Sequence, residues 1–275
     1  MIRILLYGAC ITLTLLLVIS GGLYLRLAYM LRRKGIRVAP ITHLENEKIR
    51  LPPWLPAWYS LLLGLFAFLH SVAHAGWRTT LYALVWIIVL SWVAERLGST
   101  SGIPFGRYHY TPRLQPRLFG IPLPVLLCWF AFVYVSTGVA YYLFPNIPAH
   151  TKIFGHFVQG IVGALAMVNL DLVIDPTASV AGEWHWDTKG HYFGIPASNF
   201  AGWFLVALFI IIGCTAIYKW PSPHQAKAML YENLAIYVLI VLQATIRSAV
   251  YGISKAALPS LFFILVLLVF AVVFH

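Results

Sequence analysis

The feature that most constrains this chain is a series of eight apolar stretches, each long enough to cross a bilayer. A hydrocarbon core of about 30 Å needs roughly 20 apolar residues in a helix, because a spanning backbone must satisfy its own hydrogen bonds. The stretches are residues 2–25, 54–75, 79–97, 121–144, 153–174, 198–218, 229–250 and 256–274. We therefore predict an all-α fold, a polytopic integral membrane helical bundle of about eight transmembrane helices that forms one domain, 1–275.

Seven helices remain an alternative count, since Asn233, Gln243 and Arg247 interrupt the seventh stretch. The first stretch runs directly into a basic segment, so we interpret it as a retained helix rather than a secretory signal.

The composition excludes a soluble globular domain. Hydrophobic residues make up 61% of the chain and charged residues 10%, whereas about half and a quarter are usual in soluble domains. The formal charge of +11 comes from 19 basic and 8 acidic residues. Because the basic residues lie between apolar stretches, they indicate membrane topology and lipid as the surroundings, and we predict no nucleic-acid partner.

The basic residues also predict an orientation, since Lys and Arg are retained on the cytoplasmic side of a membrane. Segment 26–53 and the connection after the third stretch are rich in them. Counting alternate connections gives 14 basic residues on that side and 5 on the other. We predict a multi-pass protein of the cell membrane with both termini on the non-cytoplasmic side, as an even number of spans requires.

Five of the acidic residues fall in or beside two predicted cytoplasmic connections, those after the third and fifth stretches: Glu95, Asp171, Asp175, Glu183 and Asp187. Asp171 and Asp175 are four residues apart, so on a helix they share a face, and Pro176 predicts that this helix ends at Asp175. Two carboxylates at the edge of a low-dielectric region do not both ionise cheaply, which makes them a candidate acid and base. The alternative is a structural pairing of one Asp with Arg96 or Arg107, or of Glu95 with Arg96.

The acidic connections are crowded with aromatic residues. In Tyr108-His-Tyr110 and Trp184-His-Trp186 the alternation places each aromatic pair on one side of an extended segment, where it can line a groove or face a cation. An ordinary interfacial aromatic belt is the alternative. Nearby glycines and prolines favour shaped loops.

His70 and His74 have the i, i+4 spacing of metal or haem ligands, but they lie near the opposite end of the second stretch, so we interpret them as packed or hydrogen-bonded histidines. A redox membrane enzyme that uses them stays an alternative. Cys10, Cys128 and Cys214 each fall inside an apolar stretch and form no metal-binding spacing. We predict no metal site and no cofactor.

Two motifs within residues 95–203 resemble the CruF-type carotenoid biosynthesis membrane proteins, the carotenoid 1,2-hydratase family. The first is Glu95, Gly98, Gly102-Ile-Pro-Phe-Gly-Arg-Tyr-His-Tyr110, Leu118-Phe-Gly-Ile-Pro122 and Trp129. The second is Asp171-Leu-Val-Ile-Asp-Pro176, Trp184-His-Trp186, Gly190-His-Tyr-Phe-Gly-Ile-Pro196 and Asn199-Phe-Ala-Gly-Trp203.

The resemblance implies cofactor-independent hydration of the terminal 1,2 double bond of an acyclic carotenoid end group to a tertiary alcohol, on substrates such as lycopene, γ-carotene or a bacterioruberin precursor. It makes a lipid-soluble polyene and water the reactants, and other carotenoid-pathway enzymes candidate partners. A proton-coupled membrane carrier and a pigment-binding scaffold without chemistry are the alternatives.

For such a hydration we predict that Asp171 or Asp175 is the acid and that the other, or Glu95, accepts a proton from water. The predicted substrate-binding residues are Phe105, Tyr108, Tyr110, Trp184, Trp186, Tyr192 and Asn199, the last as a candidate to position water.

Overall fold

The computed structural model is an all-α bundle and describes residues 2–33, 54–144, 152–218 and 223–274. Its α-helices are α1 (Ile2–Arg33), α2 (Trp54–Ala75), α3 (Trp77–Ser101), α4 (Leu123–Leu143), α5 (Lys152–Ala181), α6 (Ala197–Ile217), α7 (Pro223–Val250) and α8 (Leu258–Phe274). A short 3-10 helix, Ser254–Ala257, precedes α8. Each α-helix coincides with one predicted stretch, so the predicted fold class is confirmed.

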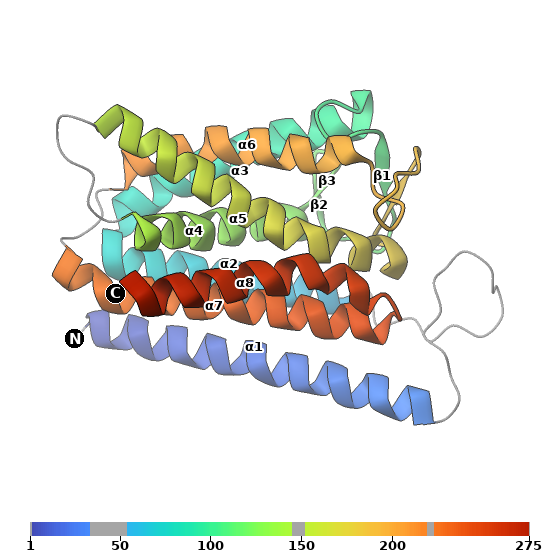
Figure 1. Ribbon diagram of the computed structural model, residues 1–275, viewed down its shortest axis with the longest axis horizontal. Helices are drawn as coiled ribbons and strands as arrows, with labels where there is room; N and C mark the ends of the chain where they lie inside the picture. Colours follow the sequence, from blue (N-terminus) through green and yellow to red (C-terminus); the bar gives the residue numbers. More distant parts are fainter. Residues whose placement is uncertain (1, 34–53, 145–151, 219–222, 275) are drawn as a thin grey trace.

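Seven of these helices are long and apolar enough to cross a membrane, and the eighth apolar helix, Ser254–Phe270, is shorter. The chain is a multi-pass membrane protein. Most of the predicted basic segment 26–53 lies outside the described residues. The helices run roughly parallel or antiparallel, and both ends of the chain lie at one end of the bundle (Figure 1).

The core of the bundle surrounds α4, which is largely buried from Leu126 to Tyr142. Large apolar side chains point outward from the surrounding helices, including those of Ile11, Tyr82, Phe209 and Phe262. A lipid environment makes such exposure favourable, because lipid tails are as apolar as these side chains.

The polar residues that interrupt the seventh stretch have specific surroundings in the bundle. Gln243 donates a hydrogen bond to the Leu17 carbonyl oxygen of α1 at 2.6 Å, and Arg247 forms an ion pair with Glu183. Asn233 is fully buried against Gly138 of α4. Gln243 and Arg247 thus have polar partners inside the bundle, and α7 is one continuous helix.

Helix α5 corrects the prediction that it ends at Asp175, because it continues through Pro176 to Ala181. Proline lacks the N–H that would bond to the carbonyl oxygen four residues earlier, on Leu172. The Tyr192 hydroxyl lies 3.0 Å from that oxygen and replaces the missing donor. Burial, and then the nearby Asp171, raise the pKa of Tyr192 to about 12, so the hydroxyl keeps its proton.

Four short strands lie at the end of the bundle opposite the termini (Figure 1). β1 (Tyr108–Tyr110) pairs antiparallel with β4 (Trp184–Trp186), and β2 (Arg117–Leu118) pairs with β3 (Ile121–Pro122). α3 stops before β1 at Gly102, whose φ of 84° is a left-handed cap and whose N–H bonds to the Gly98 carbonyl oxygen.

Candidate active site

The β1–β4 ribbon joins the two acidic connections into one site. Its register places Tyr108 opposite Trp186 and Tyr110 opposite Trp184. The ring centroids of these pairs are 5.1 Å and 6.1 Å apart. The predicted alternation is confirmed, since the four aromatic rings share one face of the ribbon while His109 and His185 lie opposite each other on the other face.

Glu95 lies near the end of α3 beneath this aromatic face and is 4% exposed. Its carboxylate accepts hydrogen bonds from the Tyr108 hydroxyl, from the Tyr110 hydroxyl at 2.6 Å and from the Trp129 indole N–H at 2.7 Å. Burial, and then the Glu95 carboxylate, raise the pKa of both tyrosines well above the ordinary value. Both hydroxyls therefore remain donors, and Glu95 is surrounded by donors rather than paired with Arg96.

Asp171 and Asp175 face the first turn of α6, where Asn199 joins them. The Asn199 Nδ2 donates to Asp171 Oδ2 at 2.6 Å and to Asp175 Oδ2 at 2.8 Å. All three residues are 2% exposed. Neither Asp has a cationic partner among the described residues, so the alternative pairing with Arg96 or Arg107 is absent there.

The two aspartates differ in their remaining contacts. Asp175 Oδ1 accepts a second hydrogen bond, from the Trp184 indole N–H at 2.5 Å. Within the described part of the chain, Asp171 accepts one side-chain hydrogen bond, from Asn199, and it lines a cavity. The carboxyl group of Asp171 is thus the one that faces open space.

The cavity has a volume of ≈190 Å³ and lies between α1, α2, α4, α5, α6 and α7. Its aromatic lining is Trp58, Tyr59, Trp129, Phe132, Trp184, Trp203 and Tyr251, and its charged lining is Arg113, Asp171, Glu183 and Arg247. The volume is below the range of about 300–1,000 Å³ for pockets that enclose a drug-sized ligand. It suits one end of a long apolar molecule.

The predicted substrate-binding residues take different places around this cavity. Of the seven, Trp184 lines it. Tyr108 and Tyr110 contact Glu95, and Phe105 is wedged between Gly98 of α3 and Gly202 of α6. The Trp186 indole nitrogen is buried without a hydrogen-bond partner among the described residues.

The other two acidic residues of this end form ion pairs. Glu183 is buried and pairs with Arg247 at the cavity wall. Asp187 is exposed and its Oδ1 lies 3.0 Å from His109 Nδ1 on the outer face of the ribbon. Glu183 thus belongs to the cavity and Asp187 to the surface.

Sequence reasoning did not assign Trp129 or Trp203 to the site, although both lie within the quoted motifs. Their rings stack at a centroid distance of 4.3 Å and an interplanar angle of 16°, and both line the cavity. Arg247 was also missed. A charge inside an apolar span is costly and usually functional, which was the available signal.

Comparison with known proteins identifies the family. A family model described as carotenoid biosynthesis protein matches residues 56–267. The bisanhydrobacterioruberin hydratase of Haloarcula japonica is 32% identical over 125 residues, which are 45% of this chain and 40% of that protein. The match thus spans less than half of the relative's length. No solved structure is significantly similar to the chain.

Proposed function

This chain belongs to the carotenoid biosynthesis protein family, and we propose that it adds water across the terminal 1,2 double bond of an acyclic carotenoid end group. The product is a tertiary alcohol. The observation that carries the proposal is a buried pair of aspartates that forms no ion pair with a described residue and of which Asp171 lines an aromatic cavity. The relative in Haloarcula japonica, whose name describes hydration of bisanhydrobacterioruberin, supports the same reaction type.

Asp171 is the acid in this proposal and Asp175 its charged partner. Two adjacent buried carboxylates without a cation are most stable when they share one proton. Asp175 accepts hydrogen bonds on both oxygens, which stabilises its ionised form. Asp171 accepts one bond and lines the cavity, which favours Asp171 as the carrier of the proton.

The reaction begins with transfer of the Asp171 proton to C2 of the terminal double bond, which leaves a tertiary cation at C1. Trp129, Trp184 and Trp203 line the same cavity as Asp171. A desolvated cation over such a ring gains about 2 kcal/mol. These rings therefore lower the energy of the cationic intermediate.

Capture of the cation by water completes the addition. The water oxygen bonds to C1, and its released proton goes to the ionised Asp171, which restores the starting state. Asn199 holds both carboxylates in place. The net change is addition of one water, which requires no redox cofactor.

Glu95 acts by positioning in this account. It does not line the cavity, and its oxygens accept bonds from Tyr108, Tyr110 and Trp129. These bonds fix the orientation of Trp129, whose ring faces the cavity. Glu95 thus joins the β1–β4 ribbon to the cavity wall.

The membrane supplies the substrate. The polyene dissolves in the acyl region with one end in the cavity, and water enters from the end of the bundle that carries the ribbon. In the proposed orientation this end is cytoplasmic and both termini lie on the other side of the cell membrane. Other carotenoid-pathway enzymes are proposed partners that deliver or consume the pigment.

Expression in a lycopene-producing bacterium tests the function. We expect a pigment heavier by one water, and Asp171→Asn should lower its formation about 10²–10⁴-fold, the usual contribution of a general acid. Asp187→Asn, on the exposed face of the ribbon, is the matched control and should retain hydration. Full hydration by equally abundant Asp171→Asn protein would contradict the acid assignment. Transport or binding of pigment without a mass change would favour a carrier or scaffold.

A further inference from the structure

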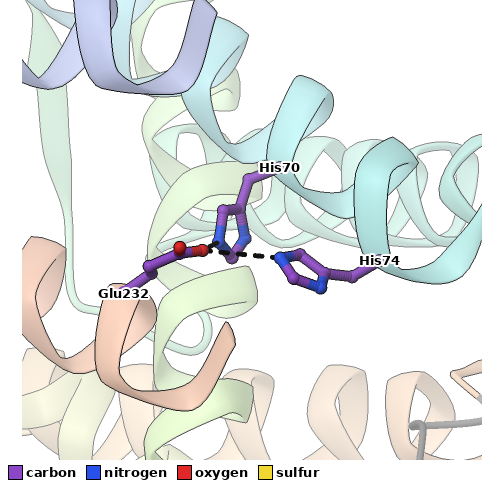
Figure 2. A group of neighbouring side chains, drawn as sticks. All are labelled: His70, His74 and Glu232. Carbon is purple, nitrogen blue, oxygen red and sulfur yellow. Dashed lines mark hydrogen bonds and ion pairs between the residues drawn. The ribbon is translucent and has the colours of Figure 1, made fainter. Parts of the chain in front are cut away.

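A second polar cluster lies near the end of the bundle opposite the ribbon, away from the aspartates. His70 and His74 occupy successive turns of α2, and Glu232 reaches them from α7 (Figure 2). His70 is 1% exposed as a residue, whereas the Glu232 side chain is 40% exposed. The cluster is therefore buried on the α2 side and open on the α7 side.

The three side chains point toward a common centre. His70 Nε2 lies 2.6 Å from Glu232 Oε2, and His74 Nε2 lies 3.4 Å from the same oxygen. One ligand atom from each residue can be chosen so that all three lie within 4.8 Å of one another. Tetrahedral zinc with bonds of about 2.0–2.1 Å requires ligand atoms roughly 3.3 Å apart. The His74–Glu232 separation already matches. The His70–Glu232 separation would lengthen by less than an ångström, and the two imidazole nitrogens, which lie within 4.8 Å of each other, would adjust toward the same spacing.

One tyrosine supports this arrangement from outside: the Tyr134 hydroxyl of α4 lies 2.7 Å from His70 Nδ1. The Tyr7 hydroxyl of α1 lies 3.3 Å from His74 Nε2, the proposed ligand nitrogen, so a bound metal would displace this contact. A partner on the second ring nitrogen is the usual feature of metal-binding histidines, because it fixes the ring orientation and tautomer. Tyr134 provides that contact for His70.

We propose that His70, His74 and Glu232 bind one zinc ion, or a divalent transition metal of similar preference, between α2 and α7. Two imidazoles and one carboxylate are a ligand set of zinc sites that keep a fourth position for water. A dication offsets the Glu232 carboxylate, and the half-exposed face at Glu232 provides the entry path. This zinc proposal does not depend on the proposed hydration, and each is tested separately.

The test is metal binding by the full chain purified in detergent or lipid nanodiscs with an affinity tag that contains no histidine. The protein is stripped with a chelator and titrated with zinc alone, and the metal content is measured by elemental analysis. We expect one tightly bound zinc per chain and a higher melting temperature with zinc, because the folded state alone holds the complete site.

Variants distinguish zinc binding at this site from nonspecific zinc binding. His74→Ala and Glu232→Gln should each weaken zinc binding by at least about 100-fold, and Tyr134→Phe by about 10–100-fold, the usual effect of losing an outer contact. His109→Ala is the matched control, since His109 also faces a carboxylate but is exposed in the β1–β4 ribbon, at the other end of the bundle. Absence of stoichiometric zinc in the folded wild-type chain would overturn the proposal, as would unchanged binding in both ligand variants. Unchanged binding in both variants would mean that the cluster is a set of structural hydrogen bonds between α2 and α7.

Discussion

At the scale of single residues, the buried carboxylates of the site are distinguished by their donors. Glu95 accepts bonds from three aromatic side chains, Asp175 from Trp184 and Asn199, and Asp171 from Asn199 alone. Hydrogen bonds to an ionised carboxylate stabilise its charge. The number of donors thus favours a charged Asp175 beside a protonated Asp171.

Trp184→Phe tests this distinction. The substitution keeps a ring in the cavity wall but removes the N–H that bonds to Asp175, so the charged form of Asp175 becomes less stable. A hydrogen bond to a charged group contributes about 1.5–3 kcal/mol, and we expect the hydration rate, measured as pigment converted per unit of protein, to fall about 10–100-fold.

The matched control is Trp92→Phe, which removes an N–H bonded to the Leu118 carbonyl oxygen in the same half of the bundle. It should leave the hydration rate unchanged. Equal rates for Trp184→Phe and wild-type protein would refute the role given to Asp175.

At the scale of elements, α5 depends on a residue beyond its own end. Pro176 leaves the Leu172 carbonyl oxygen without its helical donor, and Tyr192 supplies a hydroxyl at 3.0 Å. The same hydroxyl lies 3.0 Å from the Ala256 carbonyl oxygen in the 3-10 helix before α8. Tyr192 therefore ties the turn of α5 at Pro176 to the connection before α8.

A double-mutant cycle measures this dependence. Tyr192→Phe should lower the free energy of unfolding by about 1 kcal/mol, the value of one hydrogen bond. In Pro176→Ala protein the new amide of residue 176 donates to Leu172 itself, so the cost of Tyr192→Phe should be smaller. The measurement is denaturant unfolding of the four purified proteins in detergent. Additive costs would show that the Tyr192 hydroxyl does not replace the missing amide.

Features that depend on neighbouring residues could be predicted from the sequence, whereas contacts between distant residues could not. Helix positions were predictable because a spanning helix must be apolar over a length set by the bilayer. The extended aromatic pairs were predictable from their alternation, but the pairing of Tyr108 with Trp186 joins residues from separate connections. The predicted end of α5 was wrong because Tyr192, whose hydroxyl compensates for the amide that Pro176 lacks, lies sixteen residues later in the chain.

The residues of the candidate site also fall into a predictable group and an unpredictable group. Asp171 and Asp175 were recognisable from their i, i+4 spacing, whereas the bridging Asn199 and the stacked Trp129 and Trp203 come from other helices. His70 and His74 were visible as a pair, but Glu232 is 162 residues from His70. Contacts that depend on helix packing leave no periodic trace in one sequence.

At the scale of the whole molecule, the bundle separates two polar clusters. The β1–β4 ribbon lies at the end of the bundle opposite the termini (Figure 1). Glu95 and Asp175 bond to side chains of this ribbon, whereas His74 contacts Tyr7, near the start of α1. An antiparallel helical bundle produces this separation because every second connection returns to the same end. The proposed orientation then places the hydration site toward the cytoplasm.

Cysteine labelling tests that orientation. In a background with Cys10, Cys128 and Cys214 replaced by alanine, Lys189→Cys and Lys255→Cys should react with a membrane-impermeant thiol reagent only after permeabilisation, because positive connections stay cytoplasmic. Arg78→Cys, in the opposite half of the bundle, should react in intact cells. The reverse pattern would invert the topology without changing the fold.

The central claim is tested most directly by following solvent atoms into the pigment. Purified chain is reconstituted in lipid vesicles with lycopene and incubated without oxygen gas, in water enriched in heavy oxygen or in deuterium. The account predicts one heavy oxygen in the tertiary alcohol and one non-exchangeable deuterium on the adjacent carbon, each lost with Asp171→Asn. A pigment of unchanged mass, or a hydroxylated pigment without the heavy oxygen of the solvent, would contradict it.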